Sequence, residues 1–385
     1  MGRAETCDVA IVGGGLAGCL IAYALTVKRP ELTVRLIEAD ATLGGNHVWS
    51  FFSTDVTPAN RWIVDPFVQH QWLGYDIRFP ALRRALGSQY NSIRSQAFDI
   101  TVRSLLPPDT VVCARARQLM PTAVILENGQ TLRARGVIDA RGPAHLNLLD
   151  AGWQKFVGQE YRTARPHGLT QPIVMDATVD QIDGFRFVYV LPLSADRIFV
   201  EDTYYSDSPK LNVQAVRQRL TAYTDAQGWQ VAEVCHEENG VLPVVLGGNF
   251  EAFWAAGAKG VAKVGARAAL FHPTTGFSLP DAVRTAALIA ALPDVSGPAL
   301  HDAMYAHART TWNERGFYRM LDRMLFRTIA PDQRYRIMQR FYGLRPRLIE
   351  RFYAGSTSML DKLRILTGKP PVPILEAMKV VREKK

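Results

Sequence analysis

The residues whose types and spacing most clearly suggest chemistry are three glycines and one acidic residue near the N-terminus. Gly13, Gly15 and Gly18 form a GxGxxG pattern, and Glu38 follows twenty residues after the last of them. In such a pattern the first glycine permits a tight turn, the second lets a pyrophosphate approach the backbone, and the third lets a helix pack closely on a strand. Glu38 would accept hydrogen bonds from ribose hydroxyls, and its charge would repel the 2′-phosphate of NADP. The alternative is a glycine-rich turn that binds no ligand.

A second candidate is the pair of adjacent carboxylates Glu201 and Asp202, within the strand-like run 199–205. Adjacent side chains on a strand point to opposite faces, so at most one of the two readily faces a pocket. A carboxyl group buried among apolar walls has a raised pKa and stays protonated, as a general acid requires. The alternative is a pair of carboxylates in water at the edge of a sheet.

The elements that position the glycines can be predicted from the local pattern of apolar residues. Residues 8–12 and 34–37 predict two strands, and the apolar segment 19–26 between them predicts a helix. This order is a βαβ unit, which implies parallel strands joined by a right-handed crossover.

The rest of the chain predicts a second sheet and a helical end. Further strands are predicted at 111–113, 124–126, 136–142, 185–190 and 198–200. The first two are expected to pair, with a turn at 127–129, whereas the last two indicate a sheet outside the βαβ unit. Helices are predicted at 281–292 and, in several segments, after residue 310, with breaks near 346 and at 370–373.

Composition indicates a globular protein of enzyme size, because 48% of the 385 residues are hydrophobic and 21% are charged. The four cysteines, Cys7, Cys19, Cys113 and Cys235, contain no CxxC pair, so neither a metal site nor a disulfide framework is indicated, and a reducing cytosol fits best. No signal peptide is indicated, and no apolar run reaches the length needed to cross a bilayer.

The net charge of +9 is concentrated near the C-terminus. Residues 301–385 contain 18 Lys and Arg against 8 Asp and Glu, whereas the first 300 residues are close to neutral. Such a basic segment can face nucleic acid, an anionic membrane surface or solvent. Nucleic acid is the weakest of the three, because the basic residues match no recognised nucleic-acid-binding module.

Two further segments resemble those of FAD-dependent oxidoreductases. Residues 139–142 (DARG) are similar to the strand and loop near the adenine, and 264–281 are similar to the third flavin segment, with Gly265, His272 and Gly276 as candidate cofactor-binding residues. Most proteins of this group have Asp directly after the first of these glycines to bind the ribityl chain, but Ala266 stands there in this sequence. For His272 the alternative is an ordinary loop or core histidine. Three segments in this order favour FAD over NAD.

Four segments together are similar to the bacterial lycopene β-cyclase family: 44–51 (GGNHVWSF), 199–205 (FVEDTYY), 240–243 (GVLP) and 272–276 (HPTTG). The match extends from about residue 8 to 281. The resemblance implies an α/β protein with a Rossmann-type FAD-binding domain, an inserted β-sheet substrate domain and a C-terminal helical segment. We expect the FAD domain at 1–75, 105–160 and 260–300, the substrate domain at 76–104 and 161–259, and the basic helical region at 301–385.

The resemblance also implies a reaction without net redox change. The ψ-end of lycopene is protonated at its terminal double bond, the C5–C6 double bond attacks the cation, and loss of the C6 proton leaves a β-ring. The family uses reduced FAD, replenished by NADPH or NADH. Glu201 is the first candidate for the acid, and Asp202 is a neighbour that could hold its charge state or orient it. Trp49 and Tyr204 are candidates for aromatic faces that stabilise the cation.

Lycopene resides in the bilayer, so the resemblance implies a cytoplasmic enzyme that binds peripherally to the inner face of the cell membrane. The basic C-terminal region is the candidate contact with lipid, and the alternative is a solvated helical cap. Two other functions stay open: an FAD-dependent monooxygenase or reductase of an isoprenoid chain, and a non-catalytic membrane-associated flavoprotein. The sequence leaves the oligomeric state open.

Overall fold

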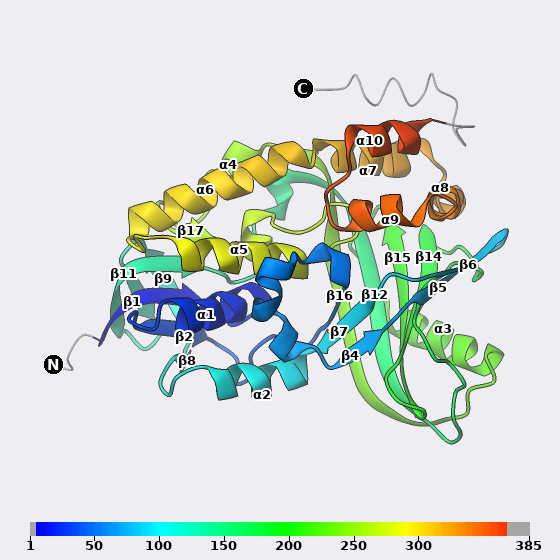
Figure 1. Cartoon of the computed structure of the whole chain (residues 1–385), viewed down its shortest axis with the longest axis horizontal. Helices are drawn as coiled ribbons and strands as arrows, with labels where there is room; N and C mark the ends of the chain where they lie inside the picture. The colour runs from blue at the N-terminus through cyan, green and yellow to red at the C-terminus, as the bar shows by residue number, and fades with distance from the viewer. Residues whose placement is uncertain (1–4, 368–385) are drawn as a thin grey trace.

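The computed structural model describes residues 5–367, and Figure 1 gives the arrangement of their helices and strands. The predicted break at 370–373 and the end of the basic region, residues 368–385, lie outside the described residues. Within the described part, no helix has both the length and the apolar character needed to cross a membrane.

The first sheet holds the βαβ unit and lies at the left of Figure 1. Its strand order is β8-β2-β1-β11-β10-β9, with β17 beside β11. The bounds are β1 (Glu5–Val12), β2 (Val34–Glu38), β8 (Val111–Cys113), β9 (Ala116–Met120), β10 (Ala123–Leu126), β11 (Thr131–Asp139) and β17 (Ala262–Lys263). Strands β1, β2, β8, β11 and β17 are parallel, and β9 and β10 pair antiparallel.

The centre of this sheet is buried on both faces, as its continuous apolar sequence predicts. Val9 and Ile11 of β1 face one hydrophobic cluster, and Ala10 and Val12 face another. Helix α1 (Leu16–Lys28) packs along α5 (Leu279–Ala291) over the first of these clusters.

The second sheet is antiparallel except for one pair, and its long strands lie at the right of Figure 1. Its order is β16-β12-β15-β14-β13-β5-β6, with β13 parallel to β5. The bounds are β5 (Tyr75–Phe79), β6 (Leu82–Leu86), β12 (Leu149–Thr163), β13 (Ile173–Asp176), β14 (Phe185–Pro192), β15 (Arg197–Ser206) and β16 (Val231–Gly248). A small third sheet contains β3 (Val48–Phe52), β7 (Tyr90–Arg94) and β4 (His70–Trp72), in that order.

The remaining helices cover the sheets and form the C-terminal end. They are α2 (Ser95–Leu105), α3 (Val213–Ala226), α4 (Phe250–Ala255), α6 (Gly297–Glu314), α7 (Gly316–Thr328), α8 (Tyr335–Tyr342), α9 (Pro346–Tyr353) and α10 (Met359–Leu366). Helix α3 packs on one face of the second sheet. Helix α7 packs against β16, at the end of this sheet that is uppermost in Figure 1. Helices α7 to α10 gather at the upper right of Figure 1, above the second sheet.

The predicted fold class is confirmed: a Rossmann-type α/β unit, a second β-sheet region and a helical C-terminal segment. One predicted pairing is wrong, because 111–113 pairs with β2 and 124–126 pairs with β9 and β11. The domain boundaries stay a proposal. Strand β12 pairs along its whole length in the second sheet, so we propose that the second segment of the substrate domain begins near residue 149 instead of 161.

Candidate active site

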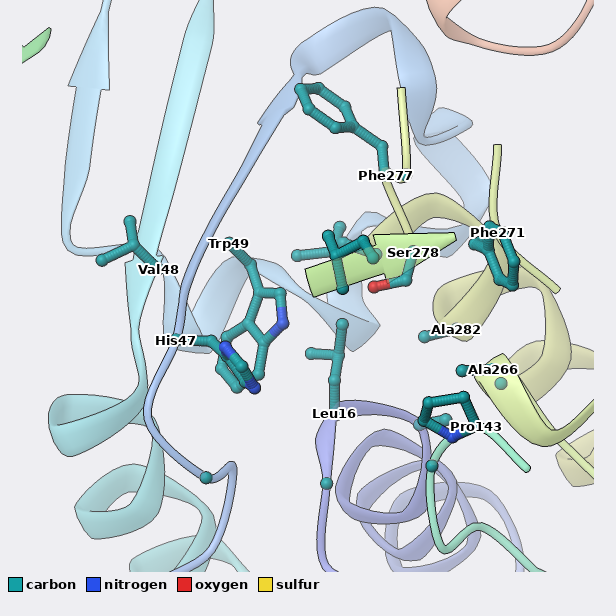
Figure 2. Close-up of a pocket in the computed structure, with 18 of the residues that line it drawn as sticks. Leu16, His47, Val48, Trp49, Pro143, Ala266, Phe271, Phe277, Ser278 and Ala282 are labelled. Carbon is teal, nitrogen blue, oxygen red and sulfur yellow. The ribbon is translucent and has the colours of Figure 1, made fainter. Parts of the chain in front are cut away.

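One continuous cavity of about 710 Å³ connects the glycine turn of the first sheet with the inner face of the second sheet. Its walls are mostly apolar, with a few polar groups, which is the usual character of a small-molecule site. Figure 2 shows part of this cavity, where Leu16 at the start of α1 and Trp49 of β3 approach it from two sides.

The predicted turn adopts the conformation that its glycines require. Gly13 has φ 110°, and a Cβ atom there would lie 2.6 Å from the backbone carbonyl of Ala140. A Cβ atom at Gly18 would lie 2.0 Å from the carbonyl oxygen of Gly13, so close packing demands glycine at both positions. A Cβ atom at Gly15 would meet nothing within 4 Å, because Gly15 borders the cavity just before the first residue of α1.

Glu38 lies at the end of β2, borders the cavity and organises the loop around it. Its Oε2 accepts a hydrogen bond from the backbone N–H of Gly14 at 2.6 Å. Its Oε1 accepts from the N–H groups of Ala39 and Asp40 at 2.6 and 2.9 Å. The contact with a ribose stays a prediction, and these backbone contacts are a role that the sequence pattern did not indicate.

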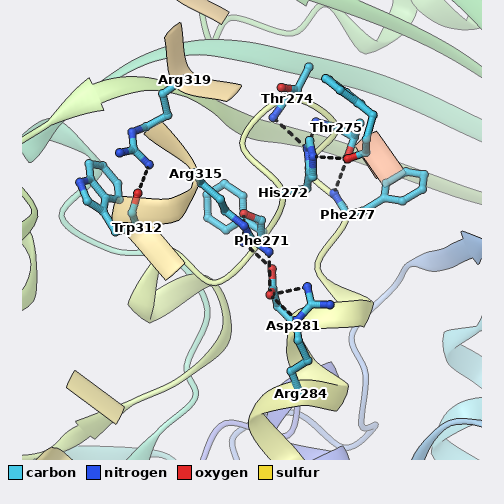
Figure 3. A network of polar contacts seen from close by, with 11 residues as sticks. Phe271, His272, Thr274, Thr275, Phe277, Asp281, Arg284, Trp312, Arg315 and Arg319 are labelled. Atoms are coloured by element: carbon cyan, nitrogen blue, oxygen red, sulfur yellow. Dashed lines mark hydrogen bonds and ion pairs between the residues drawn. The ribbon is translucent and has the colours of Figure 1, made fainter. Parts of the chain in front are cut away.

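The segment from Phe271 to Asp281, a loop that leads into the first turn of α5, forms another wall of the cavity and is fixed by buried ion pairs (Figure 3). Asp281 accepts two hydrogen bonds from Arg315, at 2.7 and 2.9 Å, and two from Arg284, at 2.8 and 3.2 Å. Burial opposes ionisation of this carboxyl, but the two guanidinium groups outweigh that effect and lower its pKa. Arg315 also donates to the carbonyl oxygen of Phe271 at 2.9 Å, which ties the two ends of the loop together.

His272 lies behind this loop and does not border the cavity. Its Nε2 donates to the carbonyl oxygen of Phe352 at 3.0 Å, and its Nδ1 accepts from the backbone N–H groups of Thr274 and Thr275 at 3.3 Å each. Burial, followed by the positive charge of Arg315, lowers the pKa of His272 to about 3, so the ring is neutral. This geometry favours the alternative of a core histidine that shapes the loop.

The other predicted residues of this segment do border the cavity. Gly265 and Gly276 have φ angles of 58° and 71°, and both line the cavity together with Ala266. The side chain of Ala266 supplies no polar group where most flavoproteins of this type have a carboxylate. Polar contacts with a bound ligand here must therefore come from the backbone and from neighbours such as Ser278.

The two adjacent carboxylates of β15 point to opposite faces of the second sheet, as strand geometry requires. Glu201 borders the cavity. Asp202 is fully buried on the other face, where it forms ion pairs with Arg186 at 2.8 Å and with Arg219 of α3 at 3.0 Å. Asp202 therefore does not reach the cavity, and its only link to the site is through the strand and its charge.

Glu201 has the properties expected of a buried acid. It is half-buried and borders the cavity. Burial, followed by the charge of Asp202, raises the pKa of Glu201 from 4.5 to about 7, although the hydroxyl of Thr203, which donates to Oε1 at 2.5 Å, opposes the shift. A substantial fraction of this carboxyl is therefore protonated at neutral pH.

The aromatic residues divide between the cavity and the core. Trp49 borders the cavity, as expected. The expectation for Tyr204 is wrong, because it lies on the same face as Asp202 and stacks with Lys155 and Arg219. Its neighbour Tyr205 borders the cavity instead, and so does Tyr189, whose hydroxyl donates to Ser50 at 2.6 Å.

Sequence reasoning missed a second glutamate at the cavity. Glu238 of β16 is 2% exposed and borders the same cavity as Glu201. Burial raises its pKa well above the usual value, and the charge of Glu201 adds to the rise. The available signal was the adjacent pair of glutamates at 237 and 238 in a strand-like run, the same type of signal that singled out Glu201.

Comparisons with known proteins decide the family. The sequence profile of a family described as lycopene cyclase protein matches residues 8–379. A lycopene beta-cyclase of Pseudescherichia vulneris is 47% identical over 370 residues, which is 96% of either chain. Those of Pantoea ananas and a Paracoccus species are 46% and 42% identical, over 97% and 98% of either chain. The chain belongs to the lycopene cyclase family.

Two solved structures share the architecture of this lycopene cyclase family member at low sequence identity, so they support the fold alone. A geranylgeranyl bacteriochlorophyll reductase-like protein from Thermoplasma acidophilum aligns with a TM-score of 0.66 and 15% identity, over 98% of this chain and 99% of its own. A flavin-dependent brominase aligns with a TM-score of 0.63 and 13% identity, over 99% and 100% of the two chains.

Proposed function

We propose that this protein closes the ψ-ends of lycopene into β-rings, as a lycopene β-cyclase of carotenoid biosynthesis. The observation that carries this function is the raised pKa of Glu201 at the wall of a largely apolar cavity. A carboxyl group that is protonated in such a place can protonate a carbon–carbon double bond. The full-length similarity to bacterial lycopene beta-cyclases supports the same reaction.

The residues present fit FAD as the resident cofactor. The open space beside Gly15 and the adjoining start of α1 would receive a pyrophosphate, and Glu38, which borders the same cavity, would accept hydrogen bonds from the neighbouring ribose. Gly265 and Gly276 would face the flavin end with backbone groups. When bound in its reduced form, the flavin would supply negative charge that stabilises the developing carbocation. NADPH or NADH is the proposed source of the reducing equivalents.

The residues of this chain would carry the proton and protect the cation. Glu201 donates its proton to the terminal double bond, which leaves a tertiary cation at C1. The apolar walls of the cavity exclude water that would otherwise capture the cation. The faces of Trp49 and Tyr189 lie at the same cavity and can stabilise positive charge by cation–π contact.

The test is anaerobic incubation of the purified protein with lycopene in liposomes, FAD and NADPH, followed by chromatography with mass detection. A product of unchanged mass with β-rings supports the cyclase, and Glu201→Gln should abolish it while FAD stays bound. A gain of oxygen would indicate a monooxygenase, and a gain of hydrogen would indicate a reductase. An unchanged substrate would leave only a non-catalytic flavoprotein.

We further propose that α10 docks on an anionic lipid surface at the cytoplasmic side of the membrane. Met359, Leu360 and Leu363 of this short helix are 77%, 78% and 59% exposed. Lys362 and Arg364 lie on the same helix and would contact lipid headgroups. The cavity is lined in part by residues of α7, α8 and α9, the helices next to α10. This position would bring a bilayer-dissolved substrate close to the cavity.

Co-sedimentation with vesicles tests this contact. Replacement of Leu360 and Leu363 by Ser should weaken binding to vesicles that contain anionic lipid by about tenfold or more, because apolar area no longer inserts. Ile100→Ser is the matched control, since Ile100 is 70% exposed on α2, at the opposite side of the molecule in Figure 1. Equal binding of both variants would contradict docking through α10.

A further inference from the structure

Glu201 and Glu238 form a carboxyl pair on one face of the second sheet. Gly158 of β12 lies directly opposite Glu201 of β15 on one side and opposite Glu238 of β16 on the other. Residues opposite each other on neighbouring strands point to the same face, so the two carboxyls share a face, with their backbones two strand spacings, about 10 Å, apart. The residue between them has no side chain, and the ring of Phe199 occupies that space.

The Oε2 atom of Glu238 is buried and has no hydrogen-bond partner among the described residues. The adjacent carboxylate of Glu237, by contrast, accepts hydrogen bonds from Arg217 at 2.5 and 2.7 Å and from Gln159 at 2.6 Å. A buried carboxyl oxygen without a partner lowers stability, and such groups are concentrated where a ligand or a reaction needs them. Glu238 is therefore available for a group inside the cavity.

Burial and mutual repulsion give the pair its proton affinity. Both pKa values are raised, in each case by burial first, and the charge of Glu201 raises that of Glu238 further. Two carboxylates in such an environment do not both ionise readily, so the pair retains a proton where isolated glutamates would have lost theirs. Once ionised, Glu238 is a strong acceptor for a proton.

We propose that Glu238 is the base of the cyclisation, which accepts the C6 proton after Glu201 has donated its own proton. This inference rests on the proposed function. The proton of Glu201 moves to C2 of the ψ-end, and the C1–C6 bond forms. The C6–H bond then breaks, its electrons complete the C5–C6 double bond, and its proton moves to Glu238. After product release, loss of this proton to water and reprotonation of Glu201 from water restore the starting state, so the step needs no oxidant or reductant.

The chemistry of the ring explains why donor and acceptor belong on the same face. C2 and C6 are both bonded to C1 in the new ring, so the proton enters and leaves at neighbouring positions of one end group. Two carboxyls at the wall of one cavity, on strands separated by a single strand, can serve both positions without reorientation of the substrate.

The experiment compares Glu238→Gln with Glu201→Gln in D₂O, using the FAD-loaded enzyme and lycopene in liposomes. Glu238→Gln should lower the rate of β-ring formation by about 100-fold or more. Protonation by Glu201 continues in this variant, so recovered lycopene should contain solvent deuterium, or the product should contain a ring whose double bond lies elsewhere. Glu201→Gln should give neither product nor deuterium in lycopene.

Glu237→Gln is the control, because it is the same change one residue away on the opposite face of β16. Retained FAD and a thermal unfolding midpoint no lower than that of the wild type establish that Glu238→Gln is folded. Formation of β-rings by Glu238→Gln at the rate of Glu237→Gln would overturn the proposal. Loss of β-rings with neither deuterium in lycopene nor an isomeric ring would also overturn it, because Glu238 would then be needed for protonation. The proposed function itself fails only if the wild-type protein forms no β-ring.

Discussion

Replacement of Glu201 by Gln should abolish cyclisation and at the same time stabilise the fold in a pH-dependent way. In the folded protein, burial raises the pKa of this carboxyl from 4.5 to about 7. Below pH 4.5 the carboxyl is protonated in both the folded and the unfolded state. As the pH rises from 4.5 to about 7, the unfolded state ionises first, so the folded state loses stability over this window.

The size of the effect follows from the shift. A rise in the pKa of Glu201 from 4.5 to about 7 corresponds to about 3 kcal/mol of unfolding free energy. The wild-type protein has lost this stability above about pH 7, whereas the variant with a neutral Gln does not lose it. Urea denaturation of both proteins at about pH 5 and about pH 8 measures this difference. The advantage of Glu201→Gln over the wild type should grow by about 2 to 3 kcal/mol between the two conditions.

The control is Glu314→Gln, which removes one negative charge at an exposed position near the end of α6. In the wild-type enzyme, the same raised pKa predicts that activity declines as the pH rises through about 7, because the protonated fraction of Glu201 falls. A constant stability difference between Glu201→Gln and the wild type at both pH values would refute the assignment of Glu201 as a neutral buried acid.

Three further predictions concern the cofactor turn and the ion pair behind the site. Gly15→Ala should fold but bind FAD more weakly in equilibrium dialysis, whereas Gly18→Ala should lower the unfolding midpoint, because its Cβ would lie 2.0 Å from a carbonyl oxygen. Glu38→Arg should lose flavin absorbance on gel filtration, since its carboxylate accepts three backbone hydrogen bonds in the loop. Asp202→Asn should destabilise the protein by about 3 kcal/mol in urea, because Arg186 keeps a buried charge without its partner. A loss of activity with unchanged stability in Asp202→Asn would contradict its placement away from the cavity.

The parts of the fold that the sequence predicted are those governed by local pattern. The strand, turn and helix around Gly13 to Gly18 follow from a short apolar run and from glycine stereochemistry, and both act within about thirty residues. The alternation of Glu201 and Asp202 follows from the period of a strand. The helix break before Pro346 follows from the constraint that proline places on the preceding residue.

The parts that the sequence did not predict depend on contacts between distant segments. The role of Glu238 requires the register of β16 against β12, which lie far apart along the chain. His272 belongs to a motif resembling a flavin loop, but the position of α9 decides that its ring donates to Phe352 instead of facing the cavity. Tyr204 was predicted at the cavity, but the aromatic side chain that borders it belongs to Tyr205, one residue later. Pattern alone does not decide which face of a buried strand meets a cavity.

The most direct test of the central claim is the reaction of the wild-type enzyme with lycopene in D₂O, with reduced FAD and no oxygen. Proton-initiated cyclisation predicts one solvent deuterium in each β-ring formed and no transfer of label from deuterated NADPH to the product. Glu201→Gln under the same conditions should return lycopene free of deuterium. Label from NADPH in the product, or β-rings formed by Glu201→Gln at the wild-type rate, would contradict an acid-initiated reaction at Glu201.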